Sequence, residues 1–241
     1  MKVYADNAAT TYLNDVALNT LLDCLKNYNG NPNSLHTDGQ VAQEKLDESR
    51  AKVAEAINAA KPNEIYFTSG GSEADNQALI SAARGLVKKG KKHLISLNIE
   101  HHAILHTLRK LEKEGFEVTL LKPQPNGIVD VKDVENAIRE DTALVSIMFA
   151  NNEMGAIQPI AEIGKLCHDK RVLFHTDAVQ AVAHLPIDVQ AMNIDMLSMS
   201  AHKFHGPKGV GALYARNGIR LINVIEGGAQ ERGKRAGTVN V

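Results

Sequence analysis

Two spacings of apolar residues alternate along this chain, one typical of helices and the other of buried strands. Helical spacing is clear in Ala42, Leu46, Val53 and Ile57, whereas residues 143–149 form a nearly continuous apolar run. The pattern predicts strands at 64–68, 93–97, 116–121, 143–149 and 171–175. It predicts helices over 16–25, 42–57, about 102–114, about 131–139 and 160–167, and one that follows Gly70 and Gly71 and carries Leu79 and Leu86. Strands that alternate with helices predict an α/β fold whose mostly parallel sheet is covered by helices on both faces.

Polar segments follow the strands at the ends where the strands stop. These segments are 68–73, 100–102, 151–153, 177–180 and 200–203. Ligands of open α/β sheets bind beyond the carboxyl ends of the strands. Because all five segments fall there, we predict that they meet in one ligand site.

Lys203 is the most informative residue of these segments. It lies between His202 and His205 and follows an apolar run, 194–199, that predicts a buried strand end. A lysine at such a place is poorly solvated, which disfavours its ammonium form and makes the neutral, nucleophilic amine accessible. This is the property that a Schiff-base lysine needs.

A glycine-rich turn at 68–76 joins a predicted strand to a helix. Gly70, Gly71 and Ser72 would let backbone N–H groups approach a phosphate at the helix N-terminus. A plain N-cap, in which Ser72 closes the turn, explains the same residues equally well. Neither a GxGxxG nor a GxxxxGK[ST] pattern is present, so the turn is not a Rossmann fingerprint or a P-loop.

Asp177 ends a strand among apolar neighbours, and Gln180 follows three residues later. A buried carboxylate needs a partner, and the protonated ring nitrogen of pyridoxal phosphate (PLP) would be one. The alternative is an aspartate that caps the next helix. A lysine, a buried acid and an anion site at a helix start together predict a PLP pocket.

Two further segments offer polar side chains. His101 could stack on a flat cofactor, and Asn151 and Asn152 could either orient a ligand or form an Asx turn. A metal alternative would use a group of histidines, His101, His102, His106, His202 and His205. No HExxH or cysteine–histidine cluster supports zinc, so we expect no metal.

The composition is that of an ordinary globular protein. The 241 residues are 44% apolar and 23% charged, with a formal net charge of −1, which gives no electrostatic footprint for nucleic acid. No apolar run reaches the length of a membrane span, and no signal-peptide pattern opens the chain. Cys24 and Cys167 form no CxxC and fall within helical patterns, so we expect a reducing, cytoplasmic setting without nucleic-acid or membrane partners.

Eight motifs together resemble the cysteine desulfurases, within the class V aminotransferase group of fold-type I PLP enzymes. They are YADNAATT (4–11), GNPNSLH (30–36), FTSGGSEADN (67–76), EHHA (100–103), NNEMGAIQP (151–159), HTDAVQA (175–181), SAHKFHGPKGVG (200–211) and GGAQERGKRAGTVN (227–240). The motifs span nearly the whole chain in the family's order. The resemblance implies the large domain of the PLP-dependent transferases, a mostly parallel seven-stranded sheet sandwiched by helices.

The resemblance also implies a role for each matching residue. Lys203 would hold PLP, Asp177 would pair with its ring nitrogen, and Gln180 would bond its phenolic oxygen. His101 would stack on the ring and assist proton transfer, and Asn152 would face the cofactor oxygen and the substrate carboxylate. The phosphate would be surrounded by Gly71, Ser72, Ser200 and His202, and by Thr238 reaching across a homodimer interface.

The implied reaction converts L-cysteine to L-alanine and passes the sulfur to an enzyme cysteine as a persulfide. The sulfur would serve iron–sulfur cluster assembly through an acceptor or scaffold protein. Two alternatives stay open. The chain could be a non-catalytic, dimeric PLP-binding fragment or scaffold, or it could belong to another class V enzyme such as a selenocysteine lyase.

The resemblance further implies that part of the family's architecture is missing. The family's nucleophilic cysteine, its carboxylate-binding arginine and its small C-terminal domain lie beyond the matched motifs. We expect residues 1–13 to be an N-terminal arm on the small-domain side and residues 14–241 to be the PLP-binding large domain. Residues 1–27 would then expose apolar surface.

Overall fold

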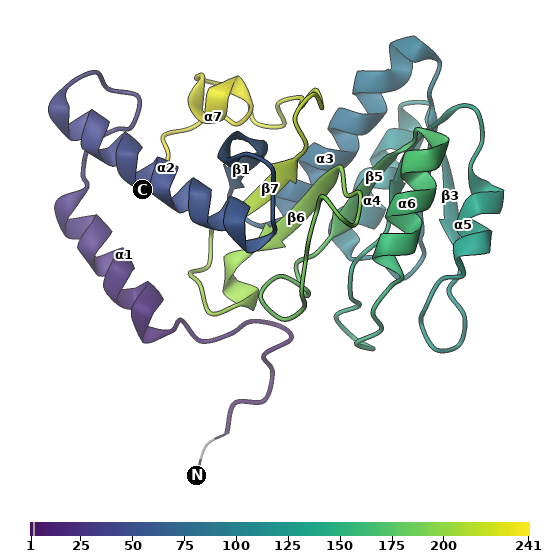
Figure 1. The fold of residues 1–241 in the computed structure, drawn as a ribbon, viewed down its shortest axis with the longest axis horizontal. Coiled ribbons are helices and arrows are strands. Elements are labelled where there is room, and N and C mark those ends of the chain that lie inside the picture. Colours follow the sequence, from purple (N-terminus) through teal and green to yellow (C-terminus); the bar gives the residue numbers. More distant parts are fainter. Residues whose placement is uncertain (2) are drawn as a thin grey trace.

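A seven-stranded sheet lies between two layers of helices in the computed structural model, which describes Met1 and residues 3–241 (Figure 1). The strands are β1 (Ile65–Thr68), β2 (His93–Leu97), β3 (Glu117–Leu121), β4 (Thr142–Ser146), β5 (Leu173–Asp177), β6 (Met196–Ser200) and β7 (Gly211–Ala215). Their order across the sheet is β1-β7-β6-β5-β4-β2-β3. The five strands from β6 to β3 are parallel, and β7 is antiparallel to both β1 and β6. The predicted mostly parallel, seven-stranded α/β fold is confirmed.

The described residues form seven α-helices and three short 3-10 helices. The α-helices are α1 (Asp15–Asn27), α2 (Thr37–Ala56), α3 (Gly71–Leu86), α4 (His102–Lys113), α5 (Val131–Ala137), α6 (Ile160–Lys170) and α7 (Gln230–Gly233). The 3-10 helices are η1 (Pro62–Glu64), η2 (Val87–Lys89) and η3 (Ala201–Lys203). Of these helices, α3 to α6, η2 and η3 lie between strands in the chain. None of the helices formed by the described residues is both long and apolar enough to cross a membrane.

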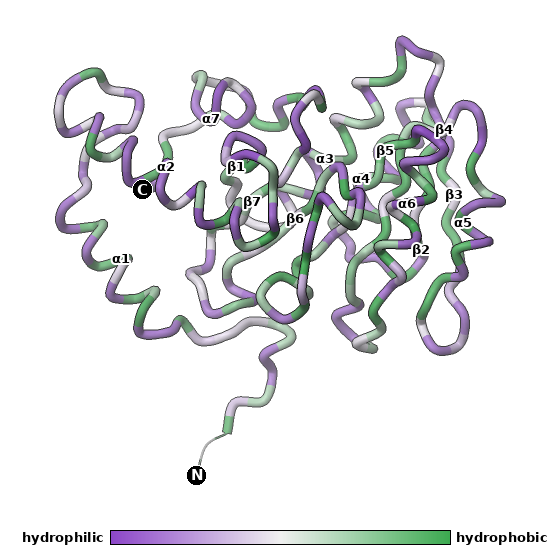
Figure 2. Tube along the Cα trace, viewed as in Figure 1, coloured by the Kyte–Doolittle hydropathy of each residue, from purple (hydrophilic) through white to green (hydrophobic). Residues whose placement is uncertain are grey.

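Each face of the sheet has its own hydrophobic core. On one face α3 and α4 contribute Ala78, Leu79, Leu108 and Leu111, all at most 2% exposed. On the other face α2, α5 and α6 pack against the sheet through residues such as Ile163. The colouring in Figure 2 places hydrophobic segments in the central strands and in the faces of the helices that cover them. The central strands are therefore buried on both sides, as their continuous apolar runs require.

β1 and β3 each begin one residue later than predicted, and three other strand assignments differ more from the sequence prediction. β4 ends at Ser146 rather than at residue 149, although the Phe149 N–H still donates to the Asp177 carbonyl at 2.8 Å. β5 begins at Leu173 rather than at residue 171, because Arg171 ends α6 in the left-handed conformation at φ 56°. β7 was not predicted. Its five residues begin at Gly211 and follow Gly206 and Gly209 in the sequence. Only their pairing with β1 and β6 shows that they form a strand.

The helix α1 carries an exposed apolar stripe. Leu18, Leu22 and Leu25 are 40%, 43% and 56% exposed, and Val16 is 75% exposed. Figure 1 shows α1 at the edge of the molecule, away from the sheet. Apolar surface was expected in residues 1–27, and the structure shows it. The division into an arm of residues 1–13 and a large domain of residues 14–241 stays a prediction.

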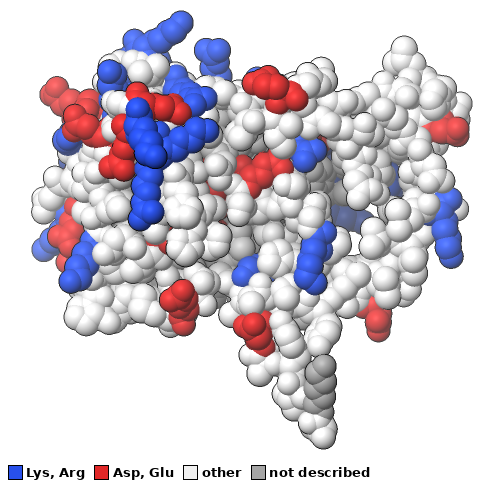
Figure 3. Space-filling model, turned by 180° about the vertical axis from the view of Figure 1, so that it is seen from behind, with Lys and Arg blue, Asp and Glu red and all other residues white. Residues whose placement is uncertain are grey.

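Charged side chains of both signs share the surface. On the rear face Lys and Arg gather toward one upper corner, and Asp and Glu lie among them (Figure 3). This mixture agrees with a formal net charge of −1 for the whole chain.

A buried ion pair joins α2 to the segment around α7. The Arg50 guanidinium donates to both Glu231 carboxylate oxygens at 2.7 and 2.8 Å and to the Ile65 carbonyl at 2.7 Å. The Phe67 N–H adds a third bond to the Glu231 carboxylate, at 3.0 Å. Both charged side chains are 5% exposed. The pair thus ties α2, β1 and the chain near its C-terminal end into one unit.

Replacing Arg50 with leucine should lower the free energy of unfolding by about 3–5 kcal/mol, because it leaves the Glu231 carboxylate buried without its cation. Urea unfolding followed by circular dichroism measures the change. Lys52→Leu, on the exposed side of the same helix, is the control and should shift stability by less than about 0.5 kcal/mol. Equal midpoints for the two variants would show that the ion pair does not stabilise the fold.

Candidate active site

A cavity of about 450 Å³ opens where the carboxyl ends of β5 and β6 meet the start of α3. It is lined by all but one of the site residues expected from the sequence: Gly71, Ser72, His101, Asn152, Asp177, Gln180, Ser200, His202 and Lys203. The exception is Thr238, which lines a separate cavity with Phe67, Ser69 and Arg235. The five polar segments thus meet at one edge of the sheet.

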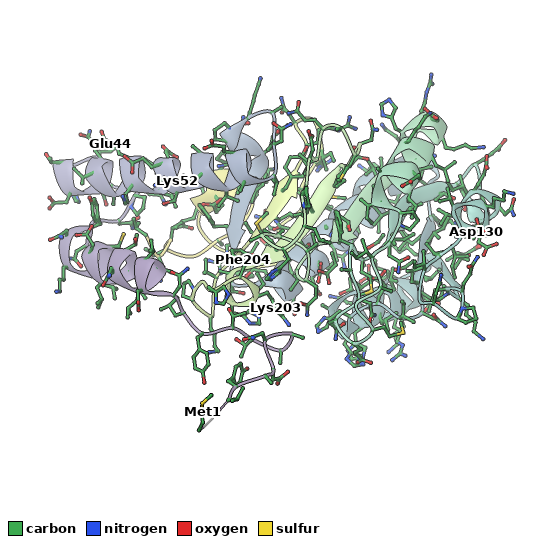
Figure 4. The ribbon with its side chains drawn as sticks, turned by 60° about the horizontal axis from the view of Figure 1, so that its bottom comes forward. Met1, Glu44, Lys52, Asp130, Lys203 and Phe204 are labelled. Atoms are coloured by element: carbon green, nitrogen blue, oxygen red, sulfur yellow. The ribbon has the colours of Figure 1, made fainter. Side chains whose placement is uncertain are left out.

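Lys203 follows directly after the fully buried strand β6. It is the last residue of η3, and its Nζ donates to the Ala8 carbonyl at 2.5 Å. Burial lowers the pKa of the Lys203 amine, and the carboxylates of Asp177 and Asp6 oppose that shift. Figure 4 shows Lys203 on the side of the sheet from which the arm ending at Met1 extends. The amine is therefore partly desolvated, the property that the sequence predicted.

The helix α3 begins without a side-chain cap. Its N-cap is Gly70, at φ 155°, so the alternative in which Ser72 caps the helix is wrong. A backbone in that region is open only to glycine. A Cβ at Gly71 would lie 2.5 Å from Val179 Cγ2, so a side chain there would push into the segment after β5. The first turn of α3 consequently presents backbone N–H groups to the cavity.

An adjoining cavity of about 350 Å³, here called the cup, lies at this helix start. It shares Gly71, Ser72, Ser200 and His202 with the main cavity and adds Thr10, Ser69, Gly70, Glu73, Lys208 and Gly209. The Glu73 carboxylate in this lining accepts the Ser69 N–H at 2.8 Å and pairs with Arg235 at 3.0 Å. His202 Nδ1 lies 3.1 Å from Thr10 Oγ1, and burial, with Lys203 and Lys208, lowers the pKa of the His202 imidazole. A helix N-terminus, two hydroxyls and a lysine suit an anion such as a phosphate.

Asp177 is the last residue of β5 and is 6% exposed. Its Oδ1 accepts the Val179 N–H at 2.9 Å and closes a turn. Turns rather than a helix follow at 179–184, so the alternative in which Asp177 caps the next helix is wrong. The carboxyl lines the cavity, and burial raises its pKa, while the Val179 N–H, His101 and Lys203 favour its charged form. Its pairing with a ring nitrogen stays a prediction.

His101 and Gln180 reach the cavity from different connections. His101 is the N-cap of α4, and its Nδ1 accepts the Ala103 N–H at 3.2 Å, which leaves the proton of a neutral ring on Nε2. Gln180 Nε2 donates to the Ala8 carbonyl at 2.9 Å. The same carbonyl thus receives bonds from Gln180 and Lys203.

The two asparagines after β4 differ in their surroundings, and the ligand-orienting role of Asn152 stays a prediction. Asn151 is buried and forms the Asx turn, its Oδ1 accepting the N–H groups of Glu153 and Met154. Asn152 is exposed and lines the cavity. Within the described part of the chain, no three His, Cys, Asp or Glu side chains are grouped as metal ligands.

Several lining residues were not found by sequence reasoning. Asp6, Ala8 and Ala9 come from the N-terminal arm, which is held by Thr11 through bonds to the His202 carbonyl. Asp75 comes from α3, four residues after Gly71 and so on the same helix face. The spacing from Gly71 was a usable signal for Asp75, whereas nothing local in the sequence placed the arm.

Neither cysteine lines the main cavity. Cys167 lies on α6 and is fully buried in the core, and burial raises the pKa of its thiol to about 12. Cys24 lies on α1 and is 8% exposed. Both cysteines thus lie on helices, as their sequence patterns predicted.

Comparison with known proteins gives a consistent result. A family model described as aminotransferase class-V matches residues 3–232. The chain belongs to this family. It is 56% identical over 239 residues to a protein of Clostridium botulinum (strain Hall) named cysteine desulfurase IscS, and 51% identical to one of that name from Methanosarcina thermophila. These matches cover 99% of this chain but only 60% and 59% of the relatives, so the chain spans about 60% of their length.

Solved structures agree with the class V assignment. A structure titled "SspA in complex with cysteine" has a TM-score of 0.94 and 41% identity, over 99% of this chain and 69% of the other. A structure titled "NIFS-LIKE PROTEIN" has a TM-score of 0.95 and 41% identity, over 100% and 66% of the two chains. The family and the fold are therefore shown by sequence and by structure.

Class V enzymes of this kind depend on PLP, and the cavity fits that cofactor at three points. Lys203 offers a partly desolvated amine, and Asp177 offers a buried carboxyl beside it. The cup at the start of α3 offers a helix N-terminus without a side-chain cap, beside Ser72, Ser200 and Lys208. An amine, a carboxyl and an anion cup are the partners that an aldehyde, a ring nitrogen and a phosphate require.

A further buried acid lies just behind the cavity. Glu100 is 5% exposed; its Oε1 accepts the Met148 N–H at 2.8 Å, and its Oε2 has no partner among the described residues. Burial, opposed by the Met148 bond and reinforced by Asp177, raises the pKa of Glu100 well above its usual value of 4.5. The folded protein therefore holds this proton more tightly than the unfolded chain does.

Glu100→Gln should flatten the pH dependence of stability. Because its pKa is raised in the fold, Glu100 contributes fully to the free energy of unfolding below pH 4.5. This contribution is lost as the pH rises through the pKa of the folded state. The loss is about 1.4 kcal/mol per pH unit for one retained proton. Urea unfolding at several pH values gives the free energy of unfolding as a function of pH. The slope of this free energy against pH should be smaller in Glu100→Gln and unchanged in the exposed control Glu44→Gln. The same slope in all three proteins would mean that Glu100 is ionised in the fold.

Proposed function

We propose that this chain forms the PLP-binding part of a cysteine desulfurase, which converts L-cysteine to L-alanine and passes the sulfur to a cysteine thiol. One observation carries the proposal. Lys203 and Asp177 line the main cavity, and the cup at the start of α3 shares four lining residues with it. The relatives' name, cysteine desulfurase, supports the reaction, and the neighbour titled as a complex with cysteine supports the substrate.

Each side chain has a task that follows from its surroundings. Lys203 Nζ, which burial shifts toward its neutral form, would hold the cofactor covalently and then accept the Cα proton of the substrate. Asp177 would hold the ring nitrogen by charge, and His101 would lie against the ring. Gln180 and Asn152 would orient the cofactor oxygen and the substrate carboxylate. When bound, PLP supplies the electron sink that stabilises the charge developing at Cα.

The phosphate cup would set the position of the whole cofactor. Gly71 and Ser72 would donate backbone N–H groups, with Ser200 and His202 completing the ring of polar contacts. We further propose a homodimer in which Thr238 of one protomer reaches the cup of the other. The exposed position of Thr238, outside its own chain's main cavity, supports this arrangement.

Neither Cys24 nor Cys167 is placed to accept sulfur in the cavity, since both are buried elsewhere. We therefore place the sulfur-accepting cysteine outside these 241 residues. We also propose that the sulfur passes to an acceptor or scaffold protein of iron–sulfur cluster assembly. We propose a cytoplasmic location for the chain.

The proposal is tested by titrating L-cysteine into the PLP-loaded chain after excess cofactor is removed. We expect a saturable change in the visible spectrum with L-cysteine and none with D-cysteine. Alanine and sulfide are assayed in the same samples, with an added dithiol as sulfur acceptor. A PLP-loaded chain whose spectrum ignores L-cysteine would contradict the substrate and favour a PLP-binding scaffold.

A further inference from the structure

Asp75 is a second acid of the cavity to which the proposed reaction gives no task. It lies on α3, lines the main cavity together with Asp177, and is only 1% exposed. Its Oδ1 has no hydrogen-bond partner among the described residues. A buried carboxyl in this condition is either charged at a high free-energy cost or protonated.

The nearest ring to Asp75 is an uncharged one. His175 Nε2 lies 3.8 Å from Asp75 Oδ1 and 3.0 Å from Ser198 Oγ, and His175 Nδ1 lies 2.9 Å from Ser146 Oγ. Both ring nitrogens thus contact hydroxyls in a fully buried position. Burial lowers the pKa of His175 to about 3, so the ring is neutral and forms no ion pair with Asp75.

The other charged groups around Asp75 are acids. Asp177 on β5 and, to a smaller extent, Glu100 after β2 repel a charge on Asp75, and the Ser198 hydroxyl on β6 opposes them by hydrogen bonding. Burial is the largest cause, and together they raise the pKa of Asp75 well above its usual value. No Lys or Arg in the described part of the chain forms an ion pair with it.

Asp177 differs from Asp75 in having positive groups and an N–H donor directed at it. The Val179 N–H donates to Asp177 at 2.9 Å, and His101 and Lys203 both favour its ionised form. His175 and Asp177, two residues apart on β5, point to the same face of the sheet, where α3 carries Asp75. The floor of the cavity therefore holds two carboxyls of different character.

We propose that Asp75 is a positioning residue that acts through Asp177. It stays protonated and, with His175 and Ser198, forms an uncharged polar layer between the sheet and α3. This layer confines the floor of the cavity to a single negative charge, carried by Asp177, and solvates that charge. The inference rests on the proposed function only in taking Asp177 as the partner of the PLP ring nitrogen.

Infrared spectroscopy of the chain tests the protonation directly, with or without PLP. A protonated carboxyl gives a C=O band well separated from that of a carboxylate. At neutral pH we expect the wild type to show the C=O absorption of two protonated carboxyls, Asp75 and Glu100. Asp75→Asn should remove one share of this absorption, and Glu100→Gln should remove the other share and leave that of Asp75 in place. A wild-type spectrum that Asp75→Asn does not change in this region would overturn the proposal.

The action through Asp177 is tested by PLP affinity and by the pH dependence of the bound cofactor's absorbance. Asp75→Asn keeps an uncharged polar group and should stay within about threefold of wild type in affinity, with the same pH midpoint. Asp75→Leu removes the polar layer next to Asp177 and should weaken binding about tenfold, which is about 1.4 kcal/mol, and shift the midpoint. Wild-type behaviour in Asp75→Leu, or a loss in Asp75→Asn as large as in Asp177→Asn, would refute the role. If PLP does not bind Lys203 of the wild-type chain, the proposed function itself is contradicted.

Discussion

Lys203→Ala should abolish covalent attachment of PLP. The Lys203 amine is partly desolvated at the end of a buried strand, which favours the neutral form that attacks an aldehyde. No other lysine lines the main cavity within the described residues, so none can replace it there. The visible absorbance of the PLP-treated variant, before and after borohydride reduction and desalting, measures the loss.

Lys52→Ala is the matched control for this experiment, because Lys52 is an exposed lysine of α2 on a helix that does not line the main cavity. It should retain the full wild-type signal. A reducible adduct that persists in Lys203→Ala at the wild-type level would contradict the assignment of Lys203.

Asp177→Asn should weaken PLP binding about 100-fold. The substitution keeps the shape of the side chain and an oxygen that accepts the Val179 N–H, so the turn after β5 is retained. It removes the charge that we propose to lie opposite the ring nitrogen, and the loss of one partner from a buried charge pair costs about 3 kcal/mol or more. That free energy corresponds to about two factors of ten in affinity.

Equilibrium titration with PLP measures this change, with Asp133→Asn on the exposed side of α5 as the control. The control should bind like the wild type. Affinities within about threefold for Asp177→Asn and Asp133→Asn would show that the ring nitrogen is held by something other than Asp177.

Much of the fold follows from local patterns. The helical spacing and the apolar runs are local, so the parallel strands and the helices between them could be predicted within a few residues. β7 could not, because its pairing joins Gly211–Ala215 to Ile65–Thr68, which lie far apart in the sequence. The antiparallel edge of the sheet depends on contacts between segments distant in the sequence. The five residues of β7 alone do not predict it.

The candidate site divides in the same way. Residues at strand ends, such as Asp177 and Lys203, could be predicted to meet because parallel strands end at one edge. The arm could not be placed, because it is held by bonds between residues 191 positions apart, such as that from Thr11 to His202. The cavity contact of Asp75 also depends on how α3 packs over β5 and β6.

Peptide mapping of the wild-type chain after PLP loading and borohydride reduction tests the central claim most directly. The account predicts one pyridoxyl adduct at near-stoichiometric yield, on the peptide that contains Lys203. Adducts spread over exposed lysines such as Lys52, with none on Lys203, would contradict a PLP site at the carboxyl ends of β5 and β6.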